Sequence, residues 1–409
     1  MSHPTGNENV RAAAIGLCEA GILAKFHTTI ATFPGDVLDR ISAFGPFAEF
    51  GRRSFDPVLK SATQTWGWRE AGRLAASKIG INILIRRKTG PFSVDAVYQS
   101  LDRRVALTLR RAFRKEVCAV YSYEDASAFS FKEAKSLGIK CFYDLPIGYW
   151  RAGRRILEME RERWPDWVNT LPSYEDSVAK LARKDEELRL ADRIFVASKY
   201  TAQTLQEFPG VLAPIEVIPY GFPPVGNSRN YSTISRARPV KLLYVGSLTQ
   251  RKGIADLFAA VESLINHVEL TVVGRKEGDD CSSLNAALAR HVWIPSLSHD
   301  KILKLMRNHD VLVLPSLFEG FGLVITEAMS QGTPVITTER TAGPDLITHG
   351  QNGWLVQAGS TQALKSSIED ILYHPRVIAE AGRKAMETAR SRPWKVYGKE
   401  LAEAVGMAF

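Results

Sequence analysis

The chain has 409 residues, of which 45% are hydrophobic and 24% are charged, close to the average of globular proteins. This composition excludes disordered, collagen-like and coiled-coil proteins, and at about 150 residues per domain the length favours two or three domains. The formal charge is 53 − 44 = +9, and residues 1–200 carry 32 basic and 24 acidic groups against 21 and 20 in residues 201–409. The basic front half indicates an anionic partner.

The cysteines and the chain start indicate the compartment. Cys18, Cys118, Cys141 and Cys281 form no C-x-x-C pair and lie at no metal-ligand spacing to a histidine. Few, scattered cysteines favour a reducing cytosol. No stretch approaches the roughly 18 apolar residues of a transmembrane helix, and no basic segment followed by an apolar run opens the chain. We therefore expect a cytoplasmic protein.

In chain order, the first half shows a helical pattern over residues 9–21 and short strand patterns over 117–121, 140–143, 194–197 and 216–219. Between them, a basic amphipathic helix is predicted from Leu101 to Glu116, with Leu101, Val105 and Leu109 on one face and arginines on the other. Such a helix either lies on an anionic membrane surface or packs its apolar face on the domain, and the second is the more frequent case.

Arginine and tryptophan are concentrated in residues 149–167. Trp150 and Arg154 belong to this cluster, together with Arg151, Arg155, Trp164 and Trp167. Aromatic rings stack on sugars, so the cluster is a candidate acceptor site. Its tryptophans equally suit the role of core anchors of a helical hairpin, and the sequence leaves both interpretations open.

The second half alternates strand and helix patterns. Apolar runs at residues 240–246, 268–274 and 311–317 are typical of buried parallel strands, and helical periodicity follows each of them. This alternation predicts βαβ units and a doubly wound sheet. The segment 222–239 is rich in Pro, Ser, Asn and Arg and breaks the periodicity. We therefore predict an α/β protein with two Rossmann-like domains facing a central cleft: residues 1–222, a linker 223–239, residues 240–390, and a C-terminal helix 391–409 that packs back onto the first domain.

The most specific pattern is P-S-L-F-E-G-F-G-L-V-I-T-E-A-M, residues 315–329. A strand ends here, and a glycine turn opens a helix, which predicts an anion site at the helix start. Glu319 and Glu327 repel anions but suit the hydroxyl groups on either side of a phosphate. A similar segment, G-S-L-T-Q-R-K-G (residues 246–253), offers Arg251 and Lys252 as phosphate ligands. Taken alone, the charged residues of either segment could instead be solvent-exposed surface residues without a ligand.

Together these segments resemble glycosyltransferase family 4, whose members are retaining sugar-nucleotide transferases of GT-B fold. The resemblance rests on Glu-x7-Glu in the setting E-G-F-G-L-V-x-x-E-A-M-x-x-G-x-P-V, from Glu319 to Val335. Further matches are Lys252-Gly253, V-I-P-Y-G at 217–221 and G-Q-N-G-W-L-V at 350–356. The resemblance covers nearly the whole chain.

The resemblance implies a role for each matching residue. Glu319 would hold donor-sugar hydroxyls, Glu327 the ribose, and Arg251 and Lys252 the diphosphate as it leaves. Other donor-binding positions would be Gly6, Leu297, Phe321, Gly322, Leu323 and Val324. The family also implies a front-face mechanism in which the leaving phosphate helps to deprotonate the acceptor. No D-x-D motif is present, so no metal is expected.

The chain departs from the family at three places. Ser247 stands where many relatives carry arginine, which leaves Arg251 to take over that duty. Asp144 stands where relatives often carry histidine, and it either accepts a hydroxyl proton or caps the strand. Finally, the chain begins almost at the loop from His3 to Gly6, so the usual first strand is missing or supplied otherwise. We expect His3 to lie on the acceptor side of the cleft.

The predicted function is transfer of a sugar from a nucleotide-diphosphate sugar to a hydroxyl of a glycan, lipid-linked or small acceptor. A sugar-nucleotide epimerase or a phosphorylase of the same fold is the alternative. A non-enzymatic basic protein that binds membrane or nucleic acid is a third class. No nucleic-acid motif is present, and such a protein has no need for Glu319 and Glu327. Peripheral attachment to the inner face of the membrane is compatible with the predicted basic helix.

Overall fold

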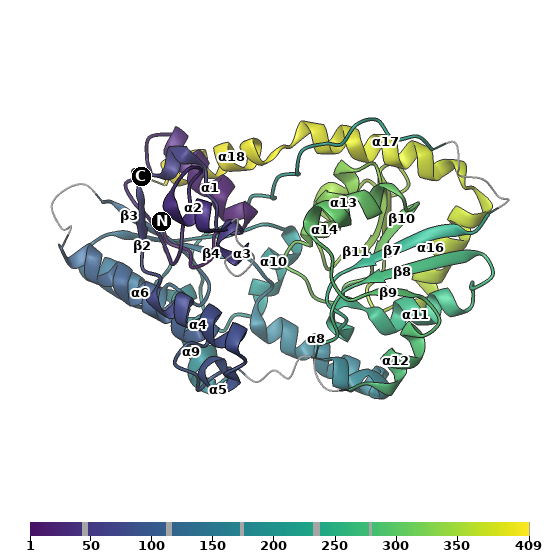
Figure 1. The fold of residues 1–409 in the computed structure, drawn as a ribbon, viewed down its shortest axis with the longest axis horizontal. Helices are drawn as coiled ribbons and strands as arrows, with labels where there is room; N and C mark the ends of the chain where they lie inside the picture. Colours follow the sequence, from purple (N-terminus) through teal and green to yellow (C-terminus); the bar gives the residue numbers. More distant parts are fainter. Residues whose placement is uncertain (43–47, 112–116, 172–175, 232–237, 278–279, 409) are drawn as a thin grey trace.

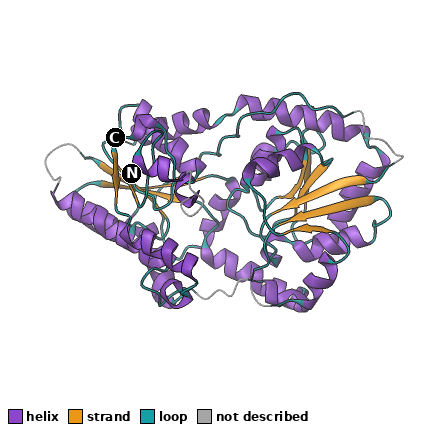
Figure 2. Cartoon of the chain, in the orientation of Figure 1, coloured by secondary structure: helices purple, strands orange, loops and turns teal. Residues whose placement is uncertain are grey.

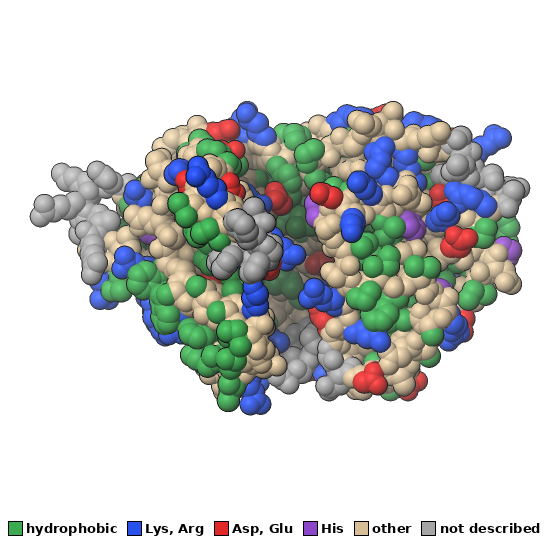
Figure 3. All heavy atoms as spheres, viewed as in Figure 1, with side chains coloured by type: hydrophobic (Ala, Val, Ile, Leu, Met, Phe, Trp, Pro, Cys, Tyr) green, Lys and Arg blue, Asp and Glu red, His purple; other side chains and the backbone are tan. Residues whose placement is uncertain are grey.

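The computed structural model describes residues 1–42, 48–111, 117–171, 176–231, 238–277 and 280–408. Two α/β domains lie side by side, and helices near the end of the chain extend from the second domain back to the first (Figure 1). In each domain helices surround a central sheet (Figure 2). The space-filling view is hollowed between the two lobes (Figure 3). The predicted fold class, two Rossmann-like domains, is confirmed.

The first domain is built on a parallel sheet in the order β3-β4-β5-β6, with β1 and β2 paired beside it. The strands are β1 (Phe26–Thr28), β2 (Thr63–Thr65), β3 (Ala119–Tyr123), β4 (Lys140–Leu145), β5 (Arg193–Val196) and β6 (Ile215–Val217). Ser2 forms parallel bridges to His27 of β1 and to Ser122 of β3. The first residues therefore lie between β1 and β3, where the expected first strand, predicted to be missing or supplied otherwise, would stand.

Helices cover both faces of this sheet (Figure 1). They are α1 (Glu8–Glu19), α2 (Val37–Ser42), α3 (Ala48–Gly51), α4 (Trp68–Ile79), α5 (Asn82–Ile85), α6 (Val94–Arg111), α7 (Ala128–Ser136), α8 (Trp150–Arg163), α9 (Val178–Leu190) and α10 (Lys199–Thr204), with 3-10 turns η2 (Pro57–Leu59), η3 (Pro165–Thr170) and η4 (Leu205–Glu207). Leu101, Val105 and Leu109 of α6 are buried, so its apolar face packs inside the domain. The rest of the predicted basic helix, 112–116, lies outside the described residues.

The second domain contains a six-stranded parallel sheet in the order β12-β11-β10-β7-β8-β9. Its strands are β7 (Val240–Val245), β8 (Val268–Val273), β9 (Val292–Ile294), β10 (Val311–Leu314), β11 (Val335–Thr338) and β12 (Gly353–Val356). Every residue of β10 and β11 is buried, as continuous apolar runs predict for strands covered on both faces. β10 ends three residues before the predicted limit because Pro315 has no N–H to continue the ladder.

The helices of the second domain connect these strands. They are η5 (Gln250–Lys252), α11 (Ile254–Glu262), α12 (Ser282–Leu288), α13 (His299–Arg307), α14 (Leu323–Ser330), α15 (Gly343–Leu346), α16 (Thr361–Tyr373), α17 (Arg376–Ser391) and α18 (Trp394–Gly406). α18 packs on α1 of the first domain, where Gly16 and Gly398 face each other. A Cβ on Gly16 would lie 2.1 Å from the Gly398 carbonyl oxygen, so the two helices touch backbone to backbone.

A second connection between the domains runs from α8 through η3, and α8 lies at the lower side of the molecule in Figure 1. Trp167 is buried and stacks on Phe258 of α11, with ring centroids 5.8 Å apart and planes 19° from parallel. Arg163 pairs with Asp256 of the same helix. Thus α8 belongs to the first domain at its beginning and contacts the second domain at its end.

Candidate active site

Two loops of the second domain meet at the carboxyl ends of the neighbouring strands β7 and β10. The Leu317 amide donates to the Arg251 carbonyl over 2.9 Å, which joins the loops. Gly253 has φ +72°, and a Cβ there would lie 2.0 Å from the Pro315 carbonyl oxygen. Only glycine fits this position, and it lets a new helix, α11, begin immediately after Lys252.

The basic pair and the first glutamate of the motif form one cluster. The Lys252 ammonium contacts Glu319 Oε2, and Arg251 Nη1 lies 3.8 Å from the same oxygen. Arg251 Nη1 also donates to the Phe318 carbonyl over 2.8 Å. The side chains are only 13–20% exposed. Burial and the adjacent Arg251 lower the pKa of Lys252, whereas contact with the Glu319 carboxylate favours the charged ammonium.

The helix after this loop begins without a side-chain cap. Gly322 takes φ +86° at the N-cap of α14, so the first turn, with Leu323 and Val324, has backbone N–H groups to offer an anion. Phe321 is buried and lies against the ring of Tyr220, with centroids 4.8 Å apart. Its side chain is therefore an anchor, and only its backbone is available to a ligand.

Glu327 lies farther along α14. Its Oε1 is 3.8 Å from Nδ1 of His299, the first residue of α13. Burial raises the pKa of Glu327, and His299 opposes that shift. Leu297, in the loop between β9 and α13, is partly buried against the core. Glu327 thus follows Glu319 on the same loop and helix. Its neighbour on α13 is His299, which the sequence analysis did not identify as a site residue.

On the first domain, the loop from His3 to Gly6 is organised by a histidine ring. His3 Nδ1 accepts hydrogen bonds from the amides of Thr5 (3.0 Å) and Gly6 (2.9 Å). Burial, with a smaller contribution from Arg53, lowers the pKa of His3 to about 3, so the ring stays neutral at neutral pH. Gly6 has φ +67°, and a Cβ would lie 2.2 Å from the ring of Phe55. This glycine is required by the loop itself.

Asp144 lies at the end of β4 beneath a group of tyrosines. It is 3% exposed, and it accepts a hydrogen bond from the Tyr121 hydroxyl over 2.5 Å. Burial raises the pKa of Asp144 to about 7. These contacts are those of a buried structural carboxyl, and they favour the capping interpretation of this residue.

The first domain holds the motif loop through a carbonyl that the sequence analysis missed. The Gly320 carbonyl accepts from the hydroxyls of Ser198 (2.6 Å) and Thr201 (3.0 Å), at the start of α10. A Cβ on Gly320 would lie 1.9 Å from the Pro146 carbonyl oxygen, so the two domains touch at the turn between Glu319 and Phe321. The only sequence signal for this contact is the S-x-x-T pattern of Ser198 and Thr201, directly after a predicted strand.

Trp150 and Arg154 are anchored at the start of α8. The Trp150 indole donates to Asp185 Oδ1 over 2.7 Å. The guanidinium groups of Arg151 and Arg154 lie 4.2 and 5.2 Å from the centre of its ring. The ring is thus covered by cations of its own helix, which supports the anchor interpretation.

Three general properties complete the description of the site. Within the described residues, no group of three or more His, Cys, Asp or Glu side chains lies close enough to hold a metal ion. All four cysteines are free. No helix in the described ranges combines the length and the apolar run that a membrane crossing requires.

Two Rossmann-like domains that face each other, with this cluster at the carboxyl ends of β7 and β10, have the GT-B fold. Residues 232–392 match the family model of glycosyl transferases group 1. The C-terminal domain is thus similar to group 1 glycosyl transferases, in agreement with the family resemblance seen in the sequence. The expected fold is confirmed.

Individual relatives agree with this match. The glycogen synthase of Mycobacterium tuberculosis is 27% identical over 267 residues, which are 63% of this chain and 61% of that protein. The chain thus spans less than two thirds of this curated relative. Sucrose-phosphate synthase from Thermosynechococcus elongatus aligns with a TM-score of 0.66 at 18% identity, over 100% of this chain and 98% of that one. HepE of Anabaena, in complex with UDP-glucose, aligns with a TM-score of 0.60 at 17% identity, over 99% and 98%.

Proposed function

We propose that the protein transfers a sugar from a nucleotide-diphosphate sugar to an acceptor hydroxyl, with retention of the anomeric configuration and without a metal ion. The observation that carries this proposal is the cluster of Lys252 and Arg251 with Glu319. Two cations and an uncapped helix start are placed beside a carboxylate. This is what a sugar diphosphate requires, because its phosphates need positive charge and its hydroxyls need acceptors.

The geometry supports a division of roles. When the bond from the sugar C1 to the phosphate oxygen breaks, negative charge develops on the leaving diphosphate, beside Lys252 and Arg251. Glu319 then exchanges its contact with Lys252 for the sugar hydroxyls, and Glu327 binds the ribose. The acceptor oxygen forms the new bond to C1 on the same face, and its proton passes to the leaving phosphate oxygen.

Binding of the nucleotide is the first test. A panel of nucleotide sugars with different bases is screened by thermal shift, and the best binder is confirmed by calorimetry. We expect one base to stabilise the protein well above the others. Absence of binding by any nucleotide sugar would contradict the proposal and favour a non-enzymatic basic protein.

Product analysis is the second test. The best donor is incubated with glycan, lipid-linked and small acceptors in EDTA, and the anomeric configuration of the product is read by NMR. An α-linked donor is expected to give an α-glycoside. Inversion would contradict retention, activity that needs added metal would contradict metal independence, and an epimerised nucleotide sugar without glycoside would establish the epimerase alternative.

A further inference from the structure

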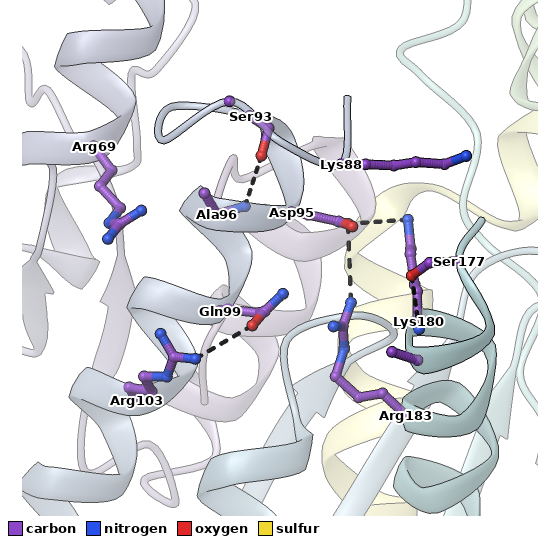
Figure 4. A pocket seen from close by; sticks show the side chains of 12 residues that line it. Arg69, Lys88, Ser93, Asp95, Ala96, Gln99, Arg103, Ser177, Lys180 and Arg183 are labelled. Carbon is purple, nitrogen blue, oxygen red and sulfur yellow. Dashed lines mark hydrogen bonds and ion pairs between the residues drawn. The ribbon is translucent and has the colours of Figure 1, made fainter. Parts of the chain in front are cut away.

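A cavity of about 420 Å³ lies in the first domain, between α4, α6, α9 and the turn before α6 (Figure 4). Five of its lining side chains are basic and one is acidic: Arg69, Lys88, Arg103, Lys180 and Arg183 against Asp95. In Figure 4, Arg69, Arg103 and Arg183 approach the same space from three different helices. The proposed sugar transfer assigns no role to this cavity.

The carboxylates near the cavity compensate its cations unequally. Lys180 pairs with three of them, at 3.0 Å from Asp95, 3.4 Å from Asp125 and 3.3 Å from Asp176. Arg183 is more distant from Asp95 and Asp125, at 3.9 and 3.7 Å. Its Nε and Nη2 atoms are buried and have no hydrogen-bond partner among the described residues. Within the described part of the chain, the charge of Arg183 is therefore compensated only by two distant carboxylates, and an anion in the cavity that this residue lines would add the missing negative charge.

Two long helices begin at the cavity. Ser93 precedes α6 and Ser177 precedes α9, and each serine hydroxyl accepts a hydrogen bond from an amide of its first turn over 3.2 Å. Both serines line the cavity. The positive ends of two helix dipoles thus add to the charge of the arginines and of Lys180.

The cavity lies near the carboxyl end of a strand of the first domain. Lys180 and Arg183 reach Asp125, which follows the carboxyl end of β3. Tyr98 of α6 hydrogen-bonds Thr5, in the loop that ends at Gly6. In open parallel sheets, ligands bind beyond the carboxyl ends of the strands. The position is therefore that of a second substrate, on the domain opposite the proposed donor site.

We propose that this cavity binds a phosphate or diphosphate group of the acceptor, so that the acceptor is a phosphorylated sugar or a phosphorylated lipid carrier. This inference rests on the proposed sugar transfer, which needs an acceptor. About 420 Å³ accommodates a diphosphate and part of the attached group.

Two variants of residues that line the cavity test the proposal. Gln99→Glu is isosteric and places a negative charge in the cavity, and the double variant Arg103→Gln/Arg183→Gln removes two positive charges. Arg110→Gln is the matched control, because it removes one charge from the same helix at an exposed position whose partner is Glu133, outside the cavity. The intact protein is first saturated with a nucleoside diphosphate to fill the donor site, and pyrophosphate binding is then measured by calorimetry.

We expect the parent and Arg110→Gln to bind pyrophosphate equally, and both cavity variants to bind it at least roughly tenfold more weakly. Equal binding by all four proteins, or none by the parent, would overturn the proposal. The nucleoside diphosphate titration is an independent measurement. Its failure would count against the proposed sugar transfer, whereas cavity-dependent pyrophosphate binding would still establish the anion site.

A second pair of measurements distinguishes the two sources of phosphate. A hexose phosphate in solution is compared with a polyprenyl phosphate in phosphatidylcholine vesicles, with phosphatidylcholine vesicles alone as the blank. Binding that both cavity variants weaken identifies the acceptor type and supports the proposal. If neither ligand shows binding that depends on the cavity, the acceptor assignment is wrong.

Discussion

The two proposed anion sites, one in each domain, differ in how positive charge is supplied. Residues 201–409 carry 21 basic and 20 acidic groups, and their proposed diphosphate site relies on Arg251, Lys252 and the start of α14. Residues 1–200 carry a surplus of 32 − 24 = +8, part of which surrounds the cavity between α4, α6 and α9. The comparison teaches that net charge identifies the domain in which cations surround a cavity, whereas the proposed donor site depends on a few groups in the loops after adjacent strands.

The largest effect is expected from Glu319→Gln. The glutamine keeps the shape but loses the charge that is proposed to bind the sugar hydroxyls, so transfer should fall at least roughly 100-fold while free nucleoside diphosphate binds nearly as before. Turnover and calorimetry are measured together, with Glu403→Gln on α18 as an exposed control. An equal loss of transfer and of nucleotide binding would place Glu319 at another part of the donor.

Lys252→Ala tests the other half of the donor cluster. Loss of one charge-assisted phosphate contact costs about 1.5–3 kcal/mol, so donor affinity and turnover should fall roughly tenfold to a hundredfold. Lys301→Ala removes the same charge from an exposed position on α13 and should change neither. If Lys252→Ala leaves both quantities unchanged, the second domain does not bind phosphate through this cluster.

Thr201→Val tests the contact between the domains. Valine keeps the size of the side chain but removes the hydroxyl that donates to the Gly320 carbonyl, and one such hydrogen bond contributes about 1 kcal/mol. We expect transfer to fall roughly fivefold, with nucleotide affinity unchanged, because the turn next to Glu319 is held less firmly. Thr108→Val, whose hydroxyl bonds only within its own helix, is the control. Loss of nucleotide affinity instead would show damage to the second domain alone.

The sequence predicted the second domain in more detail than the first. Strands such as β7 and β10 are buried on both faces and read as apolar runs, and the motif loops follow them directly. Contacts between distant segments have no such local signal. Ser198 and Thr201 meet Gly320 across about 120 residues of chain, and the cavity lining comes from three separate helices. The bridges of Ser2 to His27 and Ser122 have no sequence signal either, because a single paired residue leaves no apolar run.

Asp144→Asn is expected to have the smallest effect on transfer and a distinct effect on stability. Burial raises the pKa of Asp144 to about 7, against about 3.9 in an unfolded chain. Between these values the folded protein holds a proton that the unfolded chain has lost, so this carboxyl makes the protein less stable as the pH rises from about 4 to 7. Above about pH 7 the free-energy cost of burying the ionised carboxylate no longer changes with pH.

Asparagine carries no charge at any pH and still accepts from Tyr121. The melting temperature of Asp144→Asn minus that of the parent should therefore become more positive from pH 5 to pH 8, by a few degrees, while turnover changes little. A constant difference would mean that Asp144 is not buried as a neutral acid. A large loss of turnover, with the stability shift intact, would restore the interpretation in which this carboxyl accepts a proton, and the first domain would then contribute chemistry as well as binding.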